Sequence, residues 1–205
     1  MDTDEKVAAF LSVLDPNDST TGGGTASAVA GAMAAGLGGM VARLSLNKPG
    51  AEPPQFYRER ESALYDLSQE LFTGGQLDAT AFKAVRDAYG LPKESDKEKE
   101  SRRRAVQSAW VQATEVPLAN AEKCTRTLSI VVELEGRSNE NAASDLHCAQ
   151  YLSYVGFLGC LENVDINLPM IKDKSLVEAL AQRADTLRAS AAEHRARLPA
   201  FKVKM

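Results

Sequence analysis

The chain has 205 residues, with 24 Lys and Arg against 28 Asp and Glu, and this formal charge of −4 argues against nucleic-acid binding. Its 31 Ala against only 3 Ile, with 6% aromatic residues, favour helices and make an all-β fold very unlikely. The three cysteines are widely spaced and predict no disulfide framework. No secretory signal pattern is visible, so we expect a cytoplasmic protein.

Apolar residues recur at helical spacing along nearly the whole chain, with turn-forming residues between the segments. The predicted helices cover residues 4–14, 28–42, 56–72, 77–89, 106–134, 139–161 and 175–198. We expect Gly74-Gly75 to end the third helix and Gly136 to end the fifth, because glycine commonly terminates helices. Pro117 is expected to remove one hydrogen bond from the fifth helix and to kink it.

A charge run of four acids and five bases lies between Glu94 and Arg104. Its mixed signs are typical of a solvated helical face and not of an anion-binding patch. The chain shows no repeat of 20 to 50 residues and no low-complexity linker. We therefore expect residues 1–205 to form a single all-α domain, a helical bundle.

The uncharged stretch from Ala28 to Ala42 has some features of a membrane span. Small residues recur at Gly31, Ala35 and Gly39, a spacing that lets helix backbones approach closely. The stretch is 15 residues long, however, whereas a bilayer needs about 20. We therefore expect no membrane contact, but a central helix packed on all sides, within the bundle or across a dimer contact.

Several common site patterns are not formed. His147 and Cys148 are neighbours that point about 100° apart on a helix, so no metal site is predicted. Ser144, Asp145 and His147 are triad residue types, but Asp145 lies on another helix face and could not orient the imidazole. The glycines at 22–24 lack the Lys and Ser/Thr of a phosphate-binding loop, and no strand precedes them.

Other polar features are more informative. The glycines at 22–24 offer free amides at a helix N-terminus, suited to an anion or a polar ligand edge, although a tight turn explains them equally well. Asp78 and Asp145 lie within apolar helical patterns, and a carboxylate there is either paired structurally or part of a site with a perturbed pKa. Lys93 and Arg43 could pair with such acids or hold an anionic ligand, and surface exposure is the alternative for both.

Ordered blocks then carry a resemblance. They are Thr21–Ala26, Gly31-Ala32, Met40–Leu44, Asp78–Phe82, Tyr89–Lys93, Ala113–Leu118, Asn141–Asp145 and Asn163–Asn167. Their order and spacing, over nearly the whole chain, resemble the cyclodeaminase/cyclohydrolase family. Thr21 replaces a usual Pro, Thr25 a usual Ser, and His147-Cys148 stand where small apolar residues are usual, a change that could alter the pocket.

The resemblance implies a helical, homodimeric folate enzyme without a metal or other cofactor. Cyclohydrolases hydrolyse 5,10-methenyltetrahydrofolate to 10-formyltetrahydrofolate, whereas cyclodeaminases convert 5-formiminotetrahydrofolate to the methenyl compound and ammonia. We expect the cyclohydrolase reaction, because the chain has no formiminotransferase half and Tyr89–Lys93 looks most like those enzymes. The alternatives are the cyclodeaminase and a non-catalytic folate-binding or scaffold protein.

Both reactions need a group that stabilises a cation and moves a proton. We expect Asp145 and Asp78 to do this, with Asp145 preferred, while Asn163 and Asn167 bind the pterin edge. On the same resemblance, Lys93 and Arg43 are expected to receive the glutamate tail or to tune the acids. The expected substrate-binding residues are Gly22, Gly23, Gly24, Thr25, Arg43, Lys93, Ser144, Asn163 and Asn167. The glycine-led helix is expected at the centre of a homodimer, with the triple glycine near the subunit contact.

Overall fold

The computed structural model describes residues 3–18, 21–48, 52–196 and 198, and every regular element over these residues is helical. The helices are α1 (Thr3–Val13), α2 (Gly23–Leu44), α3 (Pro54–Tyr89), α4 (Asp96–Glu133), α5 (Ala143–Asn167) and α6 (Lys174–Arg195), with short 3₁₀ turns at Glu140–Ala142 and Leu168–Met170. The predicted all-α class is confirmed.

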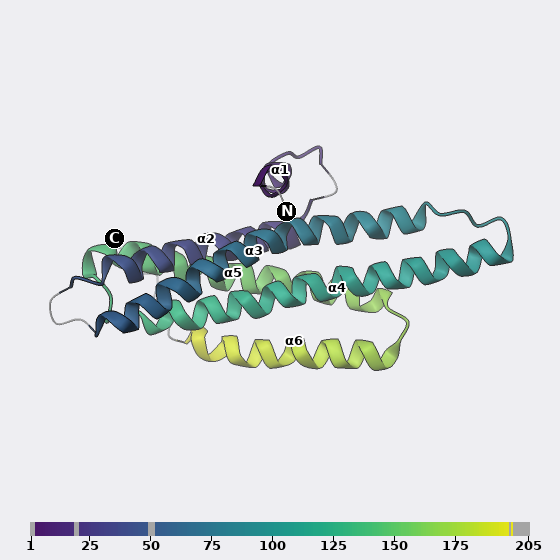
Figure 1. Ribbon diagram of the computed structural model, residues 1–205. Helices are drawn as coiled ribbons and strands as arrows, with labels where there is room; N and C mark the ends of the chain where they lie inside the picture. The colour runs from purple at the N-terminus through teal and green to yellow at the C-terminus, as the bar shows by residue number, and fades with distance from the viewer. Residues whose placement is uncertain (1–2, 19–20, 49–51, 197, 199–205) are drawn as a thin grey trace, which may run out of the picture.

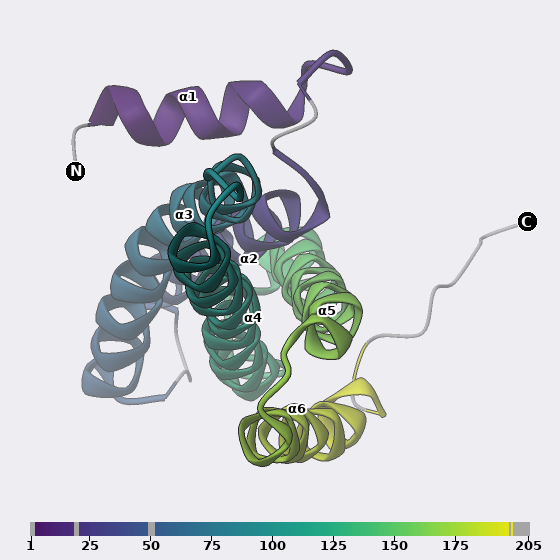
Figure 2. The same ribbon diagram turned by 90° about the vertical axis from the view of Figure 1, so that its right-hand side faces the viewer.

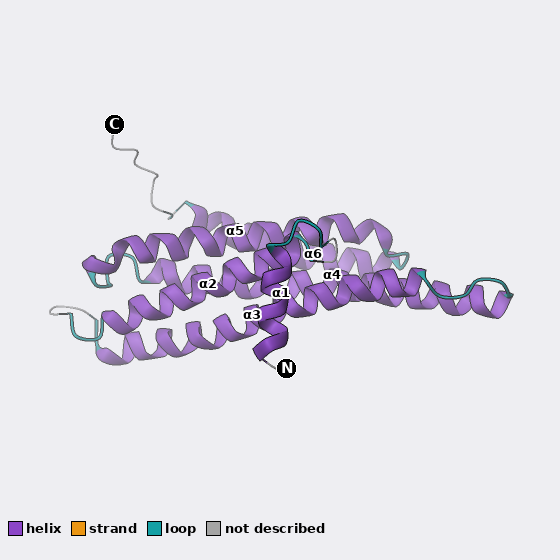
Figure 3. Ribbon diagram, turned by 90° about the horizontal axis from the view of Figure 1, so that it is seen from above, coloured by secondary structure: helices purple, strands orange, loops and turns teal. Residues whose placement is uncertain are grey.

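Four of these helices close a bundle. α2 packs on α3 and α5, and α4 packs on the same two helices from the other side. Figures 1 and 2 show α6 on the outside, where it contacts α4 and α5. Figure 3 shows α1 crossing the bundle over α2 and α3 instead of running along it.

Small residues let α2 lie close to its neighbours. A Cβ at Gly31 would lie 2.5 Å from Cys124 Sγ, and one at Gly38 would lie 2.6 Å from Val131 Cγ1. Within one chain α2 is not covered on all sides, because Met33 is 54% exposed and Met40 40% exposed, and the alternative of cover across a dimer contact stays a prediction. This solvent-facing stripe is the part of α2 that α1, α3, α4 and α5 leave uncovered within one chain.

A length and composition criterion for membrane spans selects α2 from the described residues. Within its most apolar window, 61% of the residues are buried inside the protein. A helix packed in the core of a bundle meets the same criterion.

The predicted end of a helix at Gly74-Gly75 is wrong, because α3 continues through both glycines. Gly74 lies against α4, where an added Cβ would be 2.0 Å from Asn120 Oδ1, and Asn120 Nδ2 donates to the Gly74 carbonyl at 3.2 Å. Gly75 lies against α2, where an added Cβ would be 3.4 Å from the Thr25 carbonyl oxygen. These glycines therefore allow close packing of helices. From the sequence alone, a glycine with this role looks the same as a glycine that ends a helix.

The second half of the chain follows the predicted pattern, except that α5, the fifth helix, ends later than expected. α4 continues as a helix through Pro117 and ends just before Gly136, whose φ of +69° fits the predicted stop. The charge run begins it with a capping box at Ser95, and none of its charged residues is buried, which agrees with the predicted solvated face. α5 extends to Asn167 and does not end at Leu161, because the polar residues beyond Leu161 bond to helix carbonyls instead of forming a loop.

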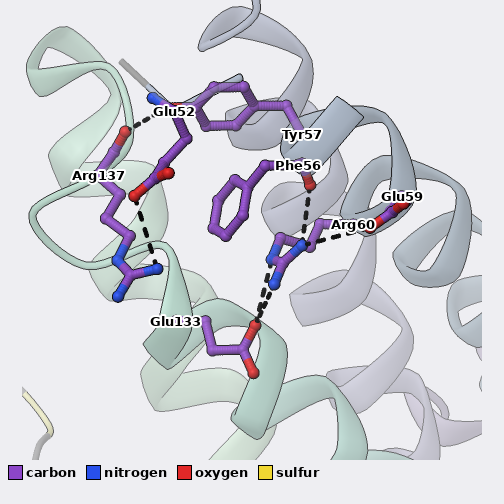
Figure 4. Close-up of polar contacts among 7 residues, drawn as sticks. All are labelled: Glu52, Phe56, Tyr57, Glu59, Arg60, Glu133 and Arg137. Carbon is purple, nitrogen blue, oxygen red and sulfur yellow. Dashed lines mark hydrogen bonds and ion pairs between the residues drawn. The ribbon is translucent and has the colours of Figure 1, made fainter. Parts of the chain in front are cut away.

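At one end of the bundle, polar groups join α3 to α4 (Figure 4). Arg60 lies 3.5 Å from the centre of the Phe56 ring and donates to Glu133 Oε2 at 2.8 and 3.1 Å. The Tyr57 hydroxyl accepts from the Glu52 amide and donates to the Arg137 carbonyl. We call this group, Glu52, Phe56, Tyr57, Arg60, Glu133 and Arg137, the polar clasp.

Candidate active site

A cavity of about 440 Å³ opens at the other end of the bundle. α3 and α4 continue past α2 and α5 there as a two-helix hairpin, seen at the right of Figure 1. The N-terminus of α2 and the C-terminus of α5 meet at the base of this hairpin, because the two helices run antiparallel. The polar residues that line the cavity are Gly22, Gly24, Asp78, Asn163 and Asn167.

The carboxyl group of Asp78 lies against the first turn of α2. Thr25 Oγ1 donates to Asp78 Oδ2 at 3.0 Å. Gly22, the N-cap residue of α2, offers no capping side chain, and the carboxyl group of Asp78 on α3 instead accepts from the backbone amide of Thr25 in this turn. Gly24 is required for this approach, since a Cβ there would lie 2.5 Å from Asp78 Oδ1.

Burial raises the pKa of Asp78 above its ordinary value, while hydrogen bonds from the hydroxyl and the backbone amide of Thr25 lower it, and burial has the larger effect. The group therefore holds a proton to higher pH than a surface carboxyl does. A carboxyl of this kind in a cavity suits the transfer of a proton to and from a ligand. The same contacts also make Asp78 a structural cap for α2.

Two amides of α5 stand beside this carboxyl in the cavity wall. Asn163 Nδ2 donates to the Gly159 carbonyl at 2.8 Å, and it lies 3.5 Å from where a Cβ of Gly23 would be. Asn167 Nδ2 donates to the Ala113 carbonyl at 2.7 Å, which ties the end of α5 to α4. Both amides are held in place by one N–H and keep a side-chain oxygen that can accept from a ligand.

The rest of the cavity wall is apolar and aromatic. It includes Phe82, Trp110, Ile166 and Met170, and Ile166 is 73% exposed. Trp110 Nε1 donates to the Tyr89 hydroxyl at 3.3 Å, which fixes the indole. Such walls suit a flat aromatic ligand. Sequence reasoning missed these residues, because an apolar residue at helical spacing reads as core; the single tryptophan of the chain was the one available signal.

Thr25 does not have the substrate-binding role that we expected. Its side chain is fully buried, and its hydroxyl lies within hydrogen-bond distance of Asp78 and of the Gly75 carbonyl, at 3.2 Å. It therefore positions the carboxyl of Asp78 and does not reach the cavity. The family's usual Ser would offer the same hydroxyl.

Three other predicted residues lie at the opposite end of the bundle. Asp145 and Ser144 are in the first turn of α5, about 27 Å along the helix from Asn163. Arg43 is at the C-terminal end of α2 and pairs with Glu61 at 3.3 Å. Asp145 and Asp78, which we expected to serve the same reaction, therefore lie far apart within the chain. Because α2 and α5 run antiparallel, the start of α5, with Asp145, lies far from the start of α2, where Asp78 binds. The sequence pattern does not show in which direction the two helices run relative to each other.

The remaining candidates are also placed. Lys93 is exposed and lines a separate groove next to the cavity. His147 Nε2 lies 3.7 Å from Glu135 Oε1, and Cys148 is exposed; both are near the start of α5, far from the cavity. Over the described residues, no group of three His, Cys, Asp or Glu could hold a metal ion.

Known proteins resemble this chain in sequence and fold. Residues 6–186 match the family model described as formiminotransferase-cyclodeaminase. The methenyltetrahydrofolate cyclohydrolase of Methylorubrum extorquens is 34% identical over 91% of this chain and 90% of its own length. The formimidoyltransferase-cyclodeaminase of Gallus gallus is 29% identical over 88% of this chain, which spans 34% of that longer protein.

A solved structure shares the same fold. The formiminotetrahydrofolate cyclodeaminase of Thermotoga maritima matches with a TM-score of 0.79 and 26% identity, over 97% of this chain and 93% of the other. Together with the family model, which covers most of the helical bundle, these matches assign the chain: it belongs to the formiminotransferase-cyclodeaminase family.

Proposed function

We propose that the protein is a methenyltetrahydrofolate cyclohydrolase, which adds water to 5,10-methenyltetrahydrofolate and releases 10-formyltetrahydrofolate. The observation that carries this proposal is the carboxyl of Asp78, buried beside the cavity with a raised pKa. The 34% identical cyclohydrolase, which this chain matches over nearly its whole length, supports the choice of reaction.

We propose that Asp78 moves the proton that the reaction requires. As a carboxylate it stabilises the cationic methenyl group and takes a proton from the attacking water, whose oxygen bonds to the methenyl carbon. The carbon is then tetrahedral, between N5 and N10. Asp78 returns the proton to N5, the C–N5 bond breaks, and the formyl group stays on N10. The second proton of the water is released, so the equation balances without a cofactor.

The cavity walls suit the rest of the substrate. The indole of Trp110 and the ring of Phe82 can stack on the flat part of the pterin. The side-chain oxygens of Asn163 and Asn167 can accept from its amino and ring N–H groups, because each amide is already fixed by its own N–H donor. We propose that these four residues orient the substrate above Asp78.

A cyclodeaminase activity is the second candidate, and the structural match to the Thermotoga maritima enzyme favours it. In that reaction N10 attacks the formimino carbon of 5-formiminotetrahydrofolate. Ammonia leaves from the same tetrahedral carbon after its nitrogen is protonated. The carboxyl of Asp78 could supply that proton, so one cavity is compatible with either reaction.

The methenyl absorbance distinguishes the candidates. The purified protein is given 5,10-methenyltetrahydrofolate and, separately, 5-formiminotetrahydrofolate. Faster loss of absorbance than in buffer supports the cyclohydrolase, and appearance of absorbance with ammonia supports the cyclodeaminase. Asp78→Asn is the matched control for a contaminating activity. No change with either compound would contradict both reactions and favour a folate-binding protein.

We also propose that the protein is a homodimer. The neighbouring helices α2 and α5 both carry exposed apolar side chains, Met33 and Met40 on one and Val155 and Leu158 on the other. Burying such side chains against a second copy would remove apolar area from water. Light scattering should give the mass of two chains, and Met33→Glu should shift it toward one. A monomeric wild type would contradict this proposal.

A further inference from the structure

The hydroxyl of Thr25 bonds differently from those of the two serines nearest to it in α2 and at its C-cap. Ser27 Oγ donates to the Gly23 carbonyl at 2.6 Å, and Ser45 Oγ donates to the Val41 carbonyl at 2.7 Å. Such bonds to the carbonyl four residues back are common for serine and threonine in helices. Thr25 lies in the first turn of α2, and its hydroxyl instead reaches across to α3.

Two acceptors of α3 lie within hydrogen-bond distance of this one hydroxyl. Asp78 Oδ2 is 3.0 Å and the Gly75 carbonyl oxygen 3.2 Å from Thr25 Oγ1. A hydroxyl has a single hydrogen, so it donates to one of them at a time, while its oxygen can also accept. Gly75 brings the second acceptor near, since a Cβ there would lie 3.5 Å from the methyl carbon of Thr25.

The two acceptors match the two charge states of Asp78. The ionised carboxylate is the stronger acceptor, so in that state the hydroxyl of Thr25 donates to it. When the carboxyl holds a proton, this hydrogen can be donated to Thr25 Oγ1, and the hydroxyl hydrogen can turn to the Gly75 carbonyl. Each state then has an acceptor for every hydrogen of the pair, whereas an unpaired buried polar group would be costly.

We propose that the hydroxyl of Thr25 turns between Asp78 and the Gly75 carbonyl as Asp78 loses and gains its proton, which makes Thr25 a positioning residue; this rests on the proposed function of the cavity. Asp78 holds a proton for part of that reaction and releases it again. Surroundings that satisfy both states need no rearrangement of the helices at each transfer. Thr25 does not line the cavity, so it acts through Asp78 and does not touch the substrate.

The groups around Asp78 allow its titration to be followed by itself. Among the described residues that line the cavity, Asp78 is the one that titrates. The charge of Asp78 acts on the thiol of Cys160 on α5, whose pKa is raised well above its ordinary value by a hydrogen bond to Cys124 of α4 and by burial. This thiol therefore stays neutral. Lys123 of α4, which also acts on it, carries its positive charge throughout.

A ¹³C NMR titration of the Asp78 carboxyl tests the proposal without any substrate, with Asp78→Asn identifying the signal. Thr25→Val keeps the shape but removes the hydroxyl. We expect the pKa of Asp78 to rise by about one pH unit, because a bond to the charged form is about twice as strong as a neutral one. Thr25→Ser should keep the wild-type pKa. Thr125→Val is the matched control, since this buried threonine donates to the Ala121 carbonyl of its own helix, and it should change nothing.

Urea unfolding distinguishes a hydroxyl that turns from one that only donates to the carboxylate. Thr25→Val should unfold at lower urea than Thr25→Ser above the pKa of Asp78, where the carboxylate loses a donor. It should also do so below that pKa, because the protonated carboxyl and the Gly75 carbonyl then lose their partner. A difference that vanishes below the pKa would overturn the turning hydroxyl.

Turnover connects the hydroxyl to the proposed reaction. In Thr25→Val the acid limb of the kcat profile should move up by the same pH unit, with little change in KM. A raised KM with an unmoved acid limb would overturn the positioning role. An unchanged pKa of Asp78 in Thr25→Val, or an equal rise in Thr25→Ser or Thr125→Val, would overturn the inference whether or not the methenyl substrate is hydrolysed. The expected pKa changes in a protein that turns over no folate would support the turning hydroxyl and contradict the proposed function alone.

Discussion

The polar side chains at the two ends of the bundle differ in how fully their hydrogen-bonding capacity is used. In the polar clasp the groups satisfy each other: Arg60 contacts both Glu133 and Phe56, and the hydroxyl of Tyr57 both accepts and donates. At the cavity, Asp78 keeps a raised pKa and the amides of α5 keep free oxygens. A satisfied network stabilises the fold, whereas groups with remaining capacity can act on a ligand. We therefore expect the chemistry to take place at the cavity end.

The largest effect is expected when each of the two candidate acids is replaced by its amide in turn. Asp78→Asn keeps the shape and can still accept from Thr25, but it cannot carry charge or move a proton. We expect turnover to fall about 10²-fold or more, with an unchanged helical circular dichroism spectrum. Asp145→Asn, at the other end, should stay within about threefold of the wild type. A large loss in Asp145→Asn alone would reverse our assignment of the two ends.

A second test adds a methyl group to the first turn of α2, beside the carboxyl of Asp78. Gly24→Ala places a methyl group 2.5 Å from Asp78 Oδ1, so the carboxyl must move. We expect a loss of about 1–3 kcal/mol in the free energy of unfolding, as for other overpacked sites, together with reduced turnover. Gly36→Ala is the control on the same helix, where nothing lies within 4 Å, and it should stabilise the protein by about 0.5–1 kcal/mol. Urea unfolding and turnover assays measure both.

A third test weakens the polar clasp. Arg60→Ala removes the ion pair with Glu133 and the stacking on Phe56. We expect the free energy of unfolding to fall by about 1–2 kcal/mol, the sum of a partly exposed ion pair and a cation–π contact. Turnover below the melting transition should not change. A loss of activity in the folded variant would show that the two ends are coupled.

The smallest expected effect is a pH dependence. The native pKa of Asp78 is raised above its ordinary value of 3.8, so the folded protein binds this proton more tightly than the unfolded chain does. The stability that this proton contributes is complete below pH 3.8 and is lost as pH rises through the native pKa. The stability of the wild type relative to Asp78→Asn should therefore decrease over that range and then level off. A difference that is constant with pH would contradict the raised pKa.

Local spacing predicts the helices well, and contacts between helices explain the errors. Apolar periodicity depends on residues three and four apart, so it identifies every long helix of the described chain. Gly74 and Gly75 could have ended a helix or allowed close packing, and only the positions of α2 and α4 decide between these roles. Residues 163–167 are a second example. Their polar side chains suggest a loop, and only the structure shows that two of them donate to carbonyl groups of α5 and α4.

The site was predicted in part. Asp78 and Asp145 look alike in sequence, because each is a carboxylate in an apolar helix, and nothing local shows that they lie at opposite ends. The glycines at 22–24, Asn163 and Asn167 do come together with Asp78, at places marked by the family resemblance and not by spacing. Trp110 was not among the predicted site residues, because an aromatic residue at helical spacing fits a place in the core equally well.

The α3–α4 hairpin is held together mainly by small side chains. Its buried interface consists of Ala81, Val85, Ala88, Val106, Ala109 and Ala113, whereas leucines and aromatic residues fill the bundle beyond it. Small side chains bury little apolar area, so this part should open locally at lower free energy than the bundle. Amide hydrogens of residues 81–113 should then exchange faster than those of α2. A folate bound between Trp110 and Asp78 would bridge hairpin and bundle, so it should slow that exchange over a region larger than its own contacts.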